Sequence, residues 1–284
     1  KNFKQMKRRN FIKTTIAGAT AAIVVPSLAC SSAERKTGLI LYTVRNEMDK
    51  DAEGTLDRIA ETGYNWLEAA SYADGKFYGR KPADFRRMIE SRGMELISSH
   101  NGLNHDNLDE VVGAASEAGL QYLVIPSLPH QWINSADALK KTADFMNMAG
   151  KKCREKGMKL GFHNHTVEFE PVEGQVPMDV FLDNTDADLV TFQLDLAWIT
   201  KSGNEPLEYF DKYPGRFELW HVKDLSEDGQ DATLGEGTMD FKPIFAGAAT
   251  AGMKYFFIEQ DNCRTHTPLE SIEISRNYLL KNIL

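Results

Sequence analysis

Short apolar segments alternate with amphipathic segments along most of the chain. From residue 37 onward this alternation occurs eight times. Apolar residues spaced as in strands predict strands at 39–43, 64–70, 94–100, 122–126, 159–164, 189–195, 217–223 and 255–260. Apolar residues with helical spacing predict helices at 52–62, 82–92, 108–118, 136–156, 178–184, 206–213, 241–251 and 268–280. A strand as apolar as Tyr122-Leu123-Val124-Ile125 is buried on both faces, which is typical of a parallel sheet.

Several predicted helices end at a glycine that directly precedes the next strand. These glycines are Gly63, Gly93, Gly119, Gly157 and Gly252, and glycine in this place caps a helix in a left-handed conformation. Eight strand–helix units in about 250 residues match a single (β/α)₈ TIM barrel with eight parallel strands. The alternative is an open doubly wound sheet, but no Gly-x-Gly-x-x-Gly follows the first strand. We therefore expect one α/β barrel domain over residues 30–284.

Charge is distributed unevenly between the first 29 residues and the rest of the chain. The whole chain has 33 basic and 41 acidic residues, and residues 1–29 contain six of the basic and none of the acidic ones. Residues 30–284 therefore hold 27 basic against 41 acidic residues, a balance of −14. Such a surface repels phosphate backbones, which argues against nucleic acid as a partner.

Residues 1–29 have the composition of an export signal. A basic segment is followed by an apolar stretch at 14–25 and by small residues up to Ala29. The apolar stretch is too short for a comfortable membrane span. Arg8-Arg9-Asn10-Phe11-Ile12-Lys13 resembles the core of a twin-arginine signal, which directs export. A buried N-terminal helix is the alternative interpretation.

The end of this segment, Ser27-Leu28-Ala29-Cys30, resembles the cleavage box of bacterial lipoproteins. If the box functions, Cys30 becomes the N-terminus and carries lipid that anchors the protein to a membrane. Ordinary cleavage near Ala29 would instead leave a periplasmic protein without an anchor. Both outcomes predict an exported protein.

Chemically active side chains gather at the C-terminal ends of the predicted strands. All seven histidines lie there or in the following loops, and this face of a barrel holds the active site in barrel enzymes. Asp195, His221 and Glu259 end three successive strands, and a carboxylate or imidazole from the fifth strand would complete a set of four ligands. Mixed nitrogen and oxygen ligands suit Mn²⁺, Mg²⁺, Co²⁺ or Zn²⁺. The alternative is that the two acids cap loops and His221 packs in the core.

Six segments together resemble the xylose-isomerase-like barrel superfamily, which includes sugar phosphate isomerases and epimerases. They are 41–45, 161–165, 195–198, 221–224, 235–237 and 258–260. The resemblance covers nearly all of the chain after the leader and implies a divalent metal held by Glu, Asp, His and Glu. Asp195, His221 and Glu259 match the last three ligands. For the first ligand this chain has His163, so either His163 or the nearby Glu168 takes that place; we expect Glu168, with His163 and His165 contacting substrate or moving a proton.

The resemblance implies an enzyme that removes a proton next to the carbonyl of a sugar through an enediolate, with the metal as Lewis acid. Returning the proton gives an isomerase or epimerase, and loss of a β-substituent gives a lyase or dehydratase on a keto-sugar or 3-keto-glycoside. The expected catalytic residues are Glu168, Glu259, His163, His165 and Lys223. The expected substrate-binding residues are His100, Glu68, Trp198 and Tyr42, with Trp132 as a further aromatic wall.

Two other classes of function stay open at this point. A non-catalytic carbohydrate-binding lipoprotein would explain the loss of the fifth-strand Glu, although pure binding needs no metal ligands. A serine or cysteine hydrolase is disfavoured because no Gly-x-Ser-x-Gly and no cysteine nucleophile motif is present. Export also bears on the substrate. Sugar phosphates are mainly intracellular, so we expect a free sugar, an oxidised sugar or a glycoside.

Overall fold

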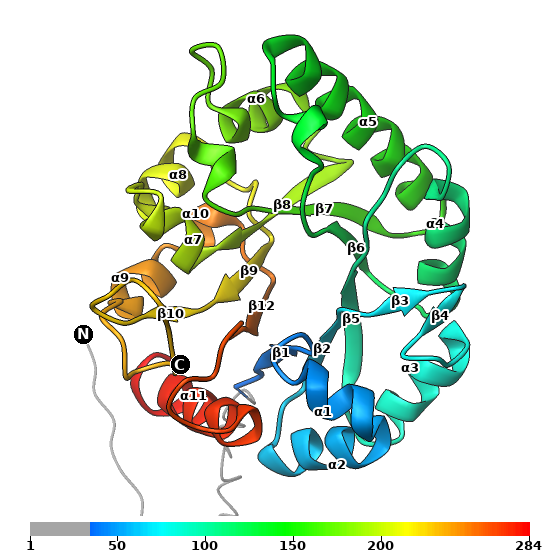
Figure 1. Ribbon diagram of the computed structural model, residues 1–284, viewed down its shortest axis with the longest axis vertical. Helices are drawn as coiled ribbons and strands as arrows, with labels where there is room; N and C mark the ends of the chain where they lie inside the picture. Colours follow the sequence, from blue (N-terminus) through cyan, green and yellow to red (C-terminus); the bar gives the residue numbers. More distant parts are fainter. Residues whose placement is uncertain (1–34) are drawn as a thin grey trace, which may run out of the picture. The chain divides into compact units, whose positions relative to one another are not determined.

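A computed structural model describes residues 35–284, which form one compact unit. The predicted export signal and Cys30 lie outside the described residues. Eight strands form a closed barrel in which β12 pairs with β1 (Figure 1), and every neighbouring pair is parallel. They are β1 Gly38–Ile40, β2 Trp66–Ala69, β5 Glu95–His100, β6 Tyr122–Ile125, β7 Lys159–His163, β8 Val190–Asp195, β9 Leu219–Val222 and β12 Tyr255–Ile258. The predicted TIM barrel is confirmed.

Helices surround the barrel as an outer ring (Figure 1). They are α1 Arg45–Lys50, α2 Ala52–Thr62, α3 Pro82–Glu90, α4 Leu108–Glu117, α5 Ala136–Glu155, α6 Pro177–Asn184, α7 Leu196–Lys201, α8 Pro206–Lys212, α9 Phe241–Ala246, α10 Ala248–Ala251 and α11 Pro268–Asn282. The helix predicted at 241–251 divides at Gly247. A Cβ at Gly247 would lie 2.9 Å from Leu207, so glycine allows close packing at this break between α9 and α10. The short helices α1 and α7 were not predicted, because one turn and a half carries too little periodicity.

Two hairpins and two 3₁₀ turns extend the loops that follow the strands. The first hairpin pairs β3 Tyr72–Ala73 with β4 Lys76–Phe77, and the second pairs β10 Asp224–Leu225 with β11 Asp231–Ala232. The 3₁₀ turns span His130–Trp132 and Val167–Phe169. Within residues 35–284, no helix combines the length and apolar character needed to cross a membrane.

Alternate strand residues face the barrel interior and the helix layer. The larger apolar cluster fills the space between strands and helices and includes Phe162, Phe192 and Trp220. A smaller cluster fills the lower barrel interior and consists of Ile40, Ile97, Tyr122, Val124, Leu219 and Phe257. Gly161 leaves room there, since a Cβ at this position would lie 2.9 Å from Val124. This packed interior forms the floor on which the polar site stands.

A buried carboxylate stabilises the barrel interior at the N-terminal ends of the strands. Glu218 accepts hydrogen bonds from Tyr122 Oη at 2.8 Å, Lys159 Nζ at 2.8 Å and Lys254 Nζ at 2.9 Å. Burial raises the pKa of Glu218, but these three donors outweigh burial and hold the pKa below its usual value of 4.5. The cluster therefore joins β6, β7 and the β12 region through one ionised group.

Candidate active site

Four side chains converge at the C-terminal ends of four neighbouring strands. They are His163 on β7, Asp195 on β8, His221 on β9 and Glu259 directly after β12, and all four are buried. One ligand atom from each lies within 4.8 Å of the others. The two-residue period of the strands explains the placement, because Leu219 and Phe257 in the interior cluster precede His221 and Glu259 by two residues. The apolar floor and the polar site are therefore successive layers of the same inward-facing positions.

The donor set fits a divalent cation. Within the described part of the chain, His163 Nδ1 and Asp195 Oδ2 are buried and have no hydrogen-bond partner. Buried polar atoms are nearly always paired, so two unpaired donor atoms in one group indicate a missing partner. Two imidazoles and two carboxylates are suitable ligands for borderline metals such as Zn²⁺. This group is a candidate metal site.

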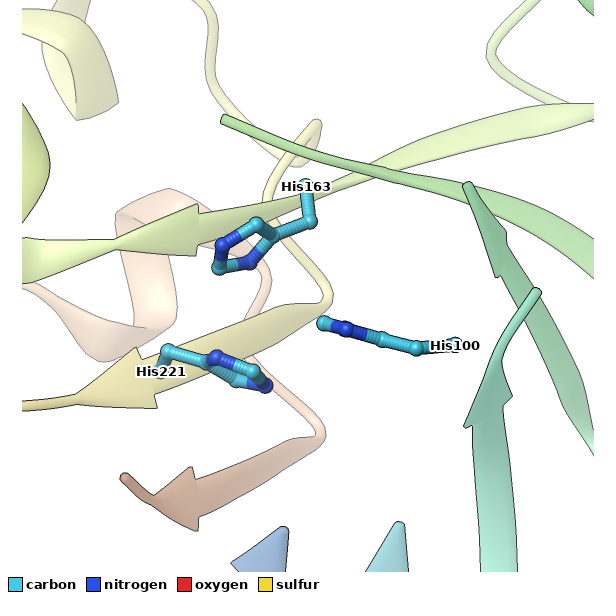
Figure 2. Close-up of side chains that lie close together, drawn as sticks. All are labelled: His100, His163 and His221. Atoms are coloured by element: carbon cyan, nitrogen blue, oxygen red, sulfur yellow. The ribbon is translucent and has the colours of Figure 1, made fainter. Parts of the chain in front are cut away.

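A third histidine reaches the same place from β5. Figure 2 shows the rings of His100, His163 and His221 turned toward one another from three strands. The ring of His100 is stacked on that of His221 at 5.1 Å, and the rings of His163 and His221 lie 4.6 Å apart. These three residues form a second group with metal-ligand spacing, which shares two members with the first.

Both ring nitrogens of His221 contact carboxylates. Nδ1 lies 2.8 Å from Glu259 Oε2, and Nε2 lies 2.5 Å from Glu68 Oε2. Burial lowers the pKa of His221, but the two carboxylates outweigh burial and raise it to about 10. Between these two carboxylates the imidazole is therefore protonated at neutral pH, and a cation bound at Nδ1 would replace the proton there.

Glu68 was predicted to contact substrate, but its carboxylate contacts His221 instead and holds that ring in place. It is completely buried on β2 and accepts hydrogen bonds from Ser98 Oγ at 2.7 Å and from Gln193 Nε2 at 2.9 Å. It does not line the cavity described below. Gln193 also contacts His100 Nε2 at 2.6 Å, so one amide links the two residues. Sequence reasoning missed Gln193 because a buried amide on a strand gives no signal by itself.

Lys223 is a buried ammonium group surrounded by three acids. Its Nζ lies 2.6 Å from Asp261 Oδ2, 3.0 Å from Glu259 Oε2 and 3.4 Å from Asp195 Oδ2. Burial lowers the pKa of Lys223, but these carboxylates outweigh burial and raise it well above its usual value. Nζ also lies 5.0 Å from the centre of the Trp198 ring. The group stays charged and cannot act as a base at neutral pH.

Asp195 has two roles that divide between its two oxygens. Oδ1 accepts the N–H groups of Ala197 and Trp198 and thereby caps α7. Its backbone N–H donates to Asn164 Oδ1 at 3.0 Å, which holds β8 against the end of β7. Oδ2 is left for the metal group. Both sequence interpretations of Asp195, as a cap and as a ligand, are compatible with this arrangement.

Glu168 is not part of the four-residue group. Its Oε2 accepts the backbone N–H of His165 at 2.7 Å, which ties the 3₁₀ turn back to the end of β7. His163 takes the place in the group for which Glu168 was predicted. The side chain of His165 instead faces the cavity, with its ring 5.5 Å from that of Trp198.

A cavity of about 760 Å³ opens above the four-residue group. Its lining includes the predicted residues Tyr42, His100, His163, His165, Trp198, Lys223 and Glu259. Trp132 lines a different cavity, together with His105, and is therefore not part of this wall. The lining also includes residues that the sequence did not reveal, namely Tyr72, Asp74, Asn101, Asn107, Glu110 and Asp261. Most of these come from loops, which have no periodicity to indicate the direction of a side chain.

The sequence and the fold of the chain are similar to those of known proteins. The family model described as xylose isomerase-like TIM barrel matches residues 56–281, so the chain belongs to that family. A solved structure of a sugar phosphate isomerase/epimerase from Parabacteroides distasonis is 29% identical, with a TM-score of 0.80, and the match covers 91% of this chain and 98% of that one.

Two curated relatives are named for a different reaction. An inosose dehydratase from Clostridium tetani is 28% identical, over 84% of this chain and 94% of its own. Inosose dehydratase 2 from Bacillus cereus is 24% identical, over 78% of this chain and 88% of its own. Proteins similar to this chain therefore include both isomerase or epimerase and dehydratase names.

Proposed function

We propose that this protein is a divalent-metal-dependent enzyme that removes a proton from the carbon next to a carbonyl group of a small sugar-like substrate. The observation that carries the proposal is the group of His163, Asp195, His221 and Glu259, with two unpaired donor atoms, on the floor of a polar cavity. A bound divalent cation would polarise the carbonyl and lower the barrier to removal of that proton. All other contributions come from side chains around the group.

We assign proton removal to His165. Its side chain faces the cavity from the end of β7, and none of the hydrogen bonds found within residues 35–284 uses its ring nitrogens. Burial and the charge of Lys223 lower the pKa of His165 to about 4, so the imidazole is neutral and able to accept a proton. Glu259 is held by His221 and Lys223 instead, which suits a ligand better than a base.

Lys223 is suited to contact a substrate oxygen on which negative charge develops. Its charge is permanent at neutral pH, and the contacts with Asp261 and Glu259 fix the position of Nζ at the cavity wall. It can donate a hydrogen bond to the carbonyl oxygen or to a leaving hydroxyl group. Tyr42 and Trp198 provide aromatic surface beside it.

Elimination is the reaction that this arrangement supports best. Epimerisation needs an acid–base group on each face of the reacting carbon, whereas elimination needs one base and one acid for the leaving group. The cavity combines a neutral imidazole with an ammonium group, and the carboxylate of Glu168 is occupied by the His165 N–H. The relatives named inosose dehydratase support the same choice. A keto-sugar, a keto-cyclitol or a 3-keto-glycoside is the corresponding substrate.

Isomerisation or epimerisation is the second candidate, and the similarity to the Parabacteroides distasonis structure favours it. Deuterium oxide separates the two reactions. An isomerase or epimerase gives a product with the same number of carbon and oxygen atoms as the substrate and with solvent deuterium on carbon. A dehydratase gives a product that is lighter by one water. Mass spectrometry of keto-sugar, keto-cyclitol and keto-glycoside reactions distinguishes these outcomes.

Metal content is the measurement that tests the common step. We expect about one divalent ion per chain in protein purified from residue 31 onward, and loss of the ion in an Asp195→Ala/His221→Ala double variant. An Asp211→Ala/His130→Ala double variant removes the same residue types from exposed positions and should keep the metal. A folded wild-type protein that takes up no Mn²⁺, Co²⁺ or Zn²⁺ but still binds sugars would support a non-catalytic binding protein and contradict the proposal.

We also propose that the protein is exported and that Cys30 carries lipid. The support is the sequence of residues 7–30 alone. Expression of the full chain in a bacterial host, followed by fractionation and mass spectrometry of the mature N-terminus, tests this. A Cys30→Ser variant should be released from the membrane fraction, and a mature protein that retains residues 1–29 would contradict the proposal.

A further inference from the structure

Phosphate groups in TIM barrels are commonly bound by the loops after the seventh and eighth strands and by a helix N-terminus nearby. In this chain those strands are β9 and β12. The backbone N–H groups of these loops are paired with oxygens of the chain itself, and the cavity lining is acidic. From these two observations we infer that the substrate carries no phosphate group. The inference rests on the proposed function and narrows its substrate to neutral polyhydroxylated carbonyl compounds.

The loop after β9 contains a ring of backbone N–H groups, but a carboxylate of the chain itself fills it. Asp224 is 1% exposed and accepts four such hydrogen bonds at 2.8–3.2 Å, from Leu225, Gly235, Gly237 and Met239. A Cβ on Gly237 would lie 2.2 Å from Asp224 Oδ1, so glycine is required for this close approach. An anion cradle of this type binds phosphate when it is free. Here its donors are already used.

The N-termini of α7 and α11, the helices that follow β8 and β12, are filled in the same way. Asp195 Oδ1 accepts the first free N–H groups of α7, at Ala197 and Trp198. At the start of α11, after the eighth strand, Thr267 Oγ1 accepts the N–H of Glu270, and Glu270 Oε2 accepts the N–H of Thr267. The backbone donors that would attract a phosphate at these places are therefore paired with protein oxygens.

The side chains of the cavity also disfavour an anion. Among residues 35–284, Lys223 is the only lysine or arginine in the lining, and Asp261 balances its charge at 2.6 Å. A divalent cation would be balanced by Asp195 and Glu259. Asp74 and Glu110 remain, and they leave the lining with an excess of two negative charges. A phosphate monoester carries up to two negative charges of its own and would be repelled from such a cavity.

The rest of the lining is suited to hydroxyl groups and to the face of a sugar ring. Asn101, Asn107 and His100 present hydrogen-bonding groups, and Tyr42 and Trp198 present aromatic surface. Aromatic faces and neutral hydrogen-bonding side chains bind uncharged polyols without a counter-charge. The lining thus offers several contacts to a neutral substrate, and its one ammonium group, Lys223, is already paired with Asp261 and Glu259.

Matched pairs of ligands test the inference. Isothermal titration calorimetry on Zn²⁺-loaded protein would compare D-fructose with D-fructose 6-phosphate and D-ribulose with D-ribulose 5-phosphate. We expect the neutral member to bind at least tenfold more tightly, with a smaller difference at high salt because screening weakens the repulsion. A phosphorylated member that binds as tightly or more tightly would overturn the inference.

A charge-reversed variant and a metal-free variant complete the test. Glu110→Lys places a cation at the cavity, so the ratio of neutral to phosphorylated affinity should fall severalfold; an unchanged ratio would contradict the role assigned to the acidic lining. The Asp195→Ala/His221→Ala variant is expected to lack the metal. Phosphate binding that the wild type shows and this variant loses is therefore binding to the zinc ion. Zinc binding with a preference for phosphorylated ligands overturns only this inference. No zinc binding by the wild-type protein overturns the proposed function as well.

Discussion

Glu68 Oε2 lies 2.5 Å from His221 Nε2, below the floor of the cavity. The contact joins β2 to β9, which lie on different sides of the barrel. Because Glu68 accepts from Nε2–H, Nδ1 faces the candidate metal group, and a cation that replaced the Nδ1 proton would find the ring already oriented, as carboxylates orient metal-binding histidines. Ser98 and Gln193 hold the carboxylate in turn. The metal group therefore depends on a buried carboxylate that does not belong to it.

Replacement of Glu68 by Gln should weaken metal binding while the fold is kept. The amide has nearly the same shape but loses the charge that orients His221, and loss of such a partner lowers metal affinity about 10- to 100-fold. Zinc titration by calorimetry measures the change. Glu61→Gln on the exposed side of α2 is the matched control and should bind zinc like the wild type. Equal zinc affinity in Glu68→Gln would contradict the positioning role.

Substitutions of His163 and Glu168 show which of the two completes the ligand set with Asp195, His221 and Glu259. His163→Ala removes an atom of the group and should lower the metal content strongly, whereas Glu168→Gln keeps an acceptor for the His165 N–H and should retain the metal. Metal analysis of both purified variants, with circular dichroism to verify folding, distinguishes them. Loss of metal in Glu168→Gln with retention in His163→Ala would restore the ligand set expected from the sequence.

Acid should destabilise the barrel partly through Glu218. Its pKa is lowered in the folded protein, so its stabilising contribution is complete above the unfolded value and is lost as the pH falls through the lower folded value. We expect the free energy of unfolding to fall below about pH 4.5 through this group. Glu218→Gln should be less stable than the wild type at pH 7, and the difference should shrink at low pH. Urea unfolding at several pH values measures this, and a constant difference would contradict the assignment.

Two glycine-to-alanine substitutions should change stability in opposite directions. A Cβ at Gly38 would lie 2.2 Å from the carbonyl oxygen of Phe256, where β1 closes the barrel against β12, so Gly38→Ala should destabilise by about 1–3 kcal/mol or more. Gly113 lies exposed within α4 with open space around it, so Gly113→Ala should stabilise by about 0.5–1 kcal/mol. Denaturant unfolding of both variants is the measurement, and equal effects would contradict the close approach at Gly38.

The barrel was predictable because its signals are local. Helix α2 begins and ends at the predicted residues, and each predicted strand contains the observed one, except that β1 begins one residue earlier. Asp195, His221 and Glu259 could be grouped from the sequence, since parallel strands bring their C-terminal ends to one face and the two-residue period directs the side chains inward. These predictions need only the order of the strands and the alternation of side chains between the two faces of each strand.

Tertiary structure alone decided the rest of the site. His163, rather than Glu168, completes the group because the turn after β7 directs Glu168 to the His165 N–H. Glu68 became buried beneath His221, although its place at a strand end suggested substrate contact. Asp74 and Glu110 reach the cavity from a hairpin and a helix start. Strand periodicity determines the face on which a residue lies, but the course of a loop and the partner of each polar atom depend on contacts between distant segments, which a single sequence does not reveal.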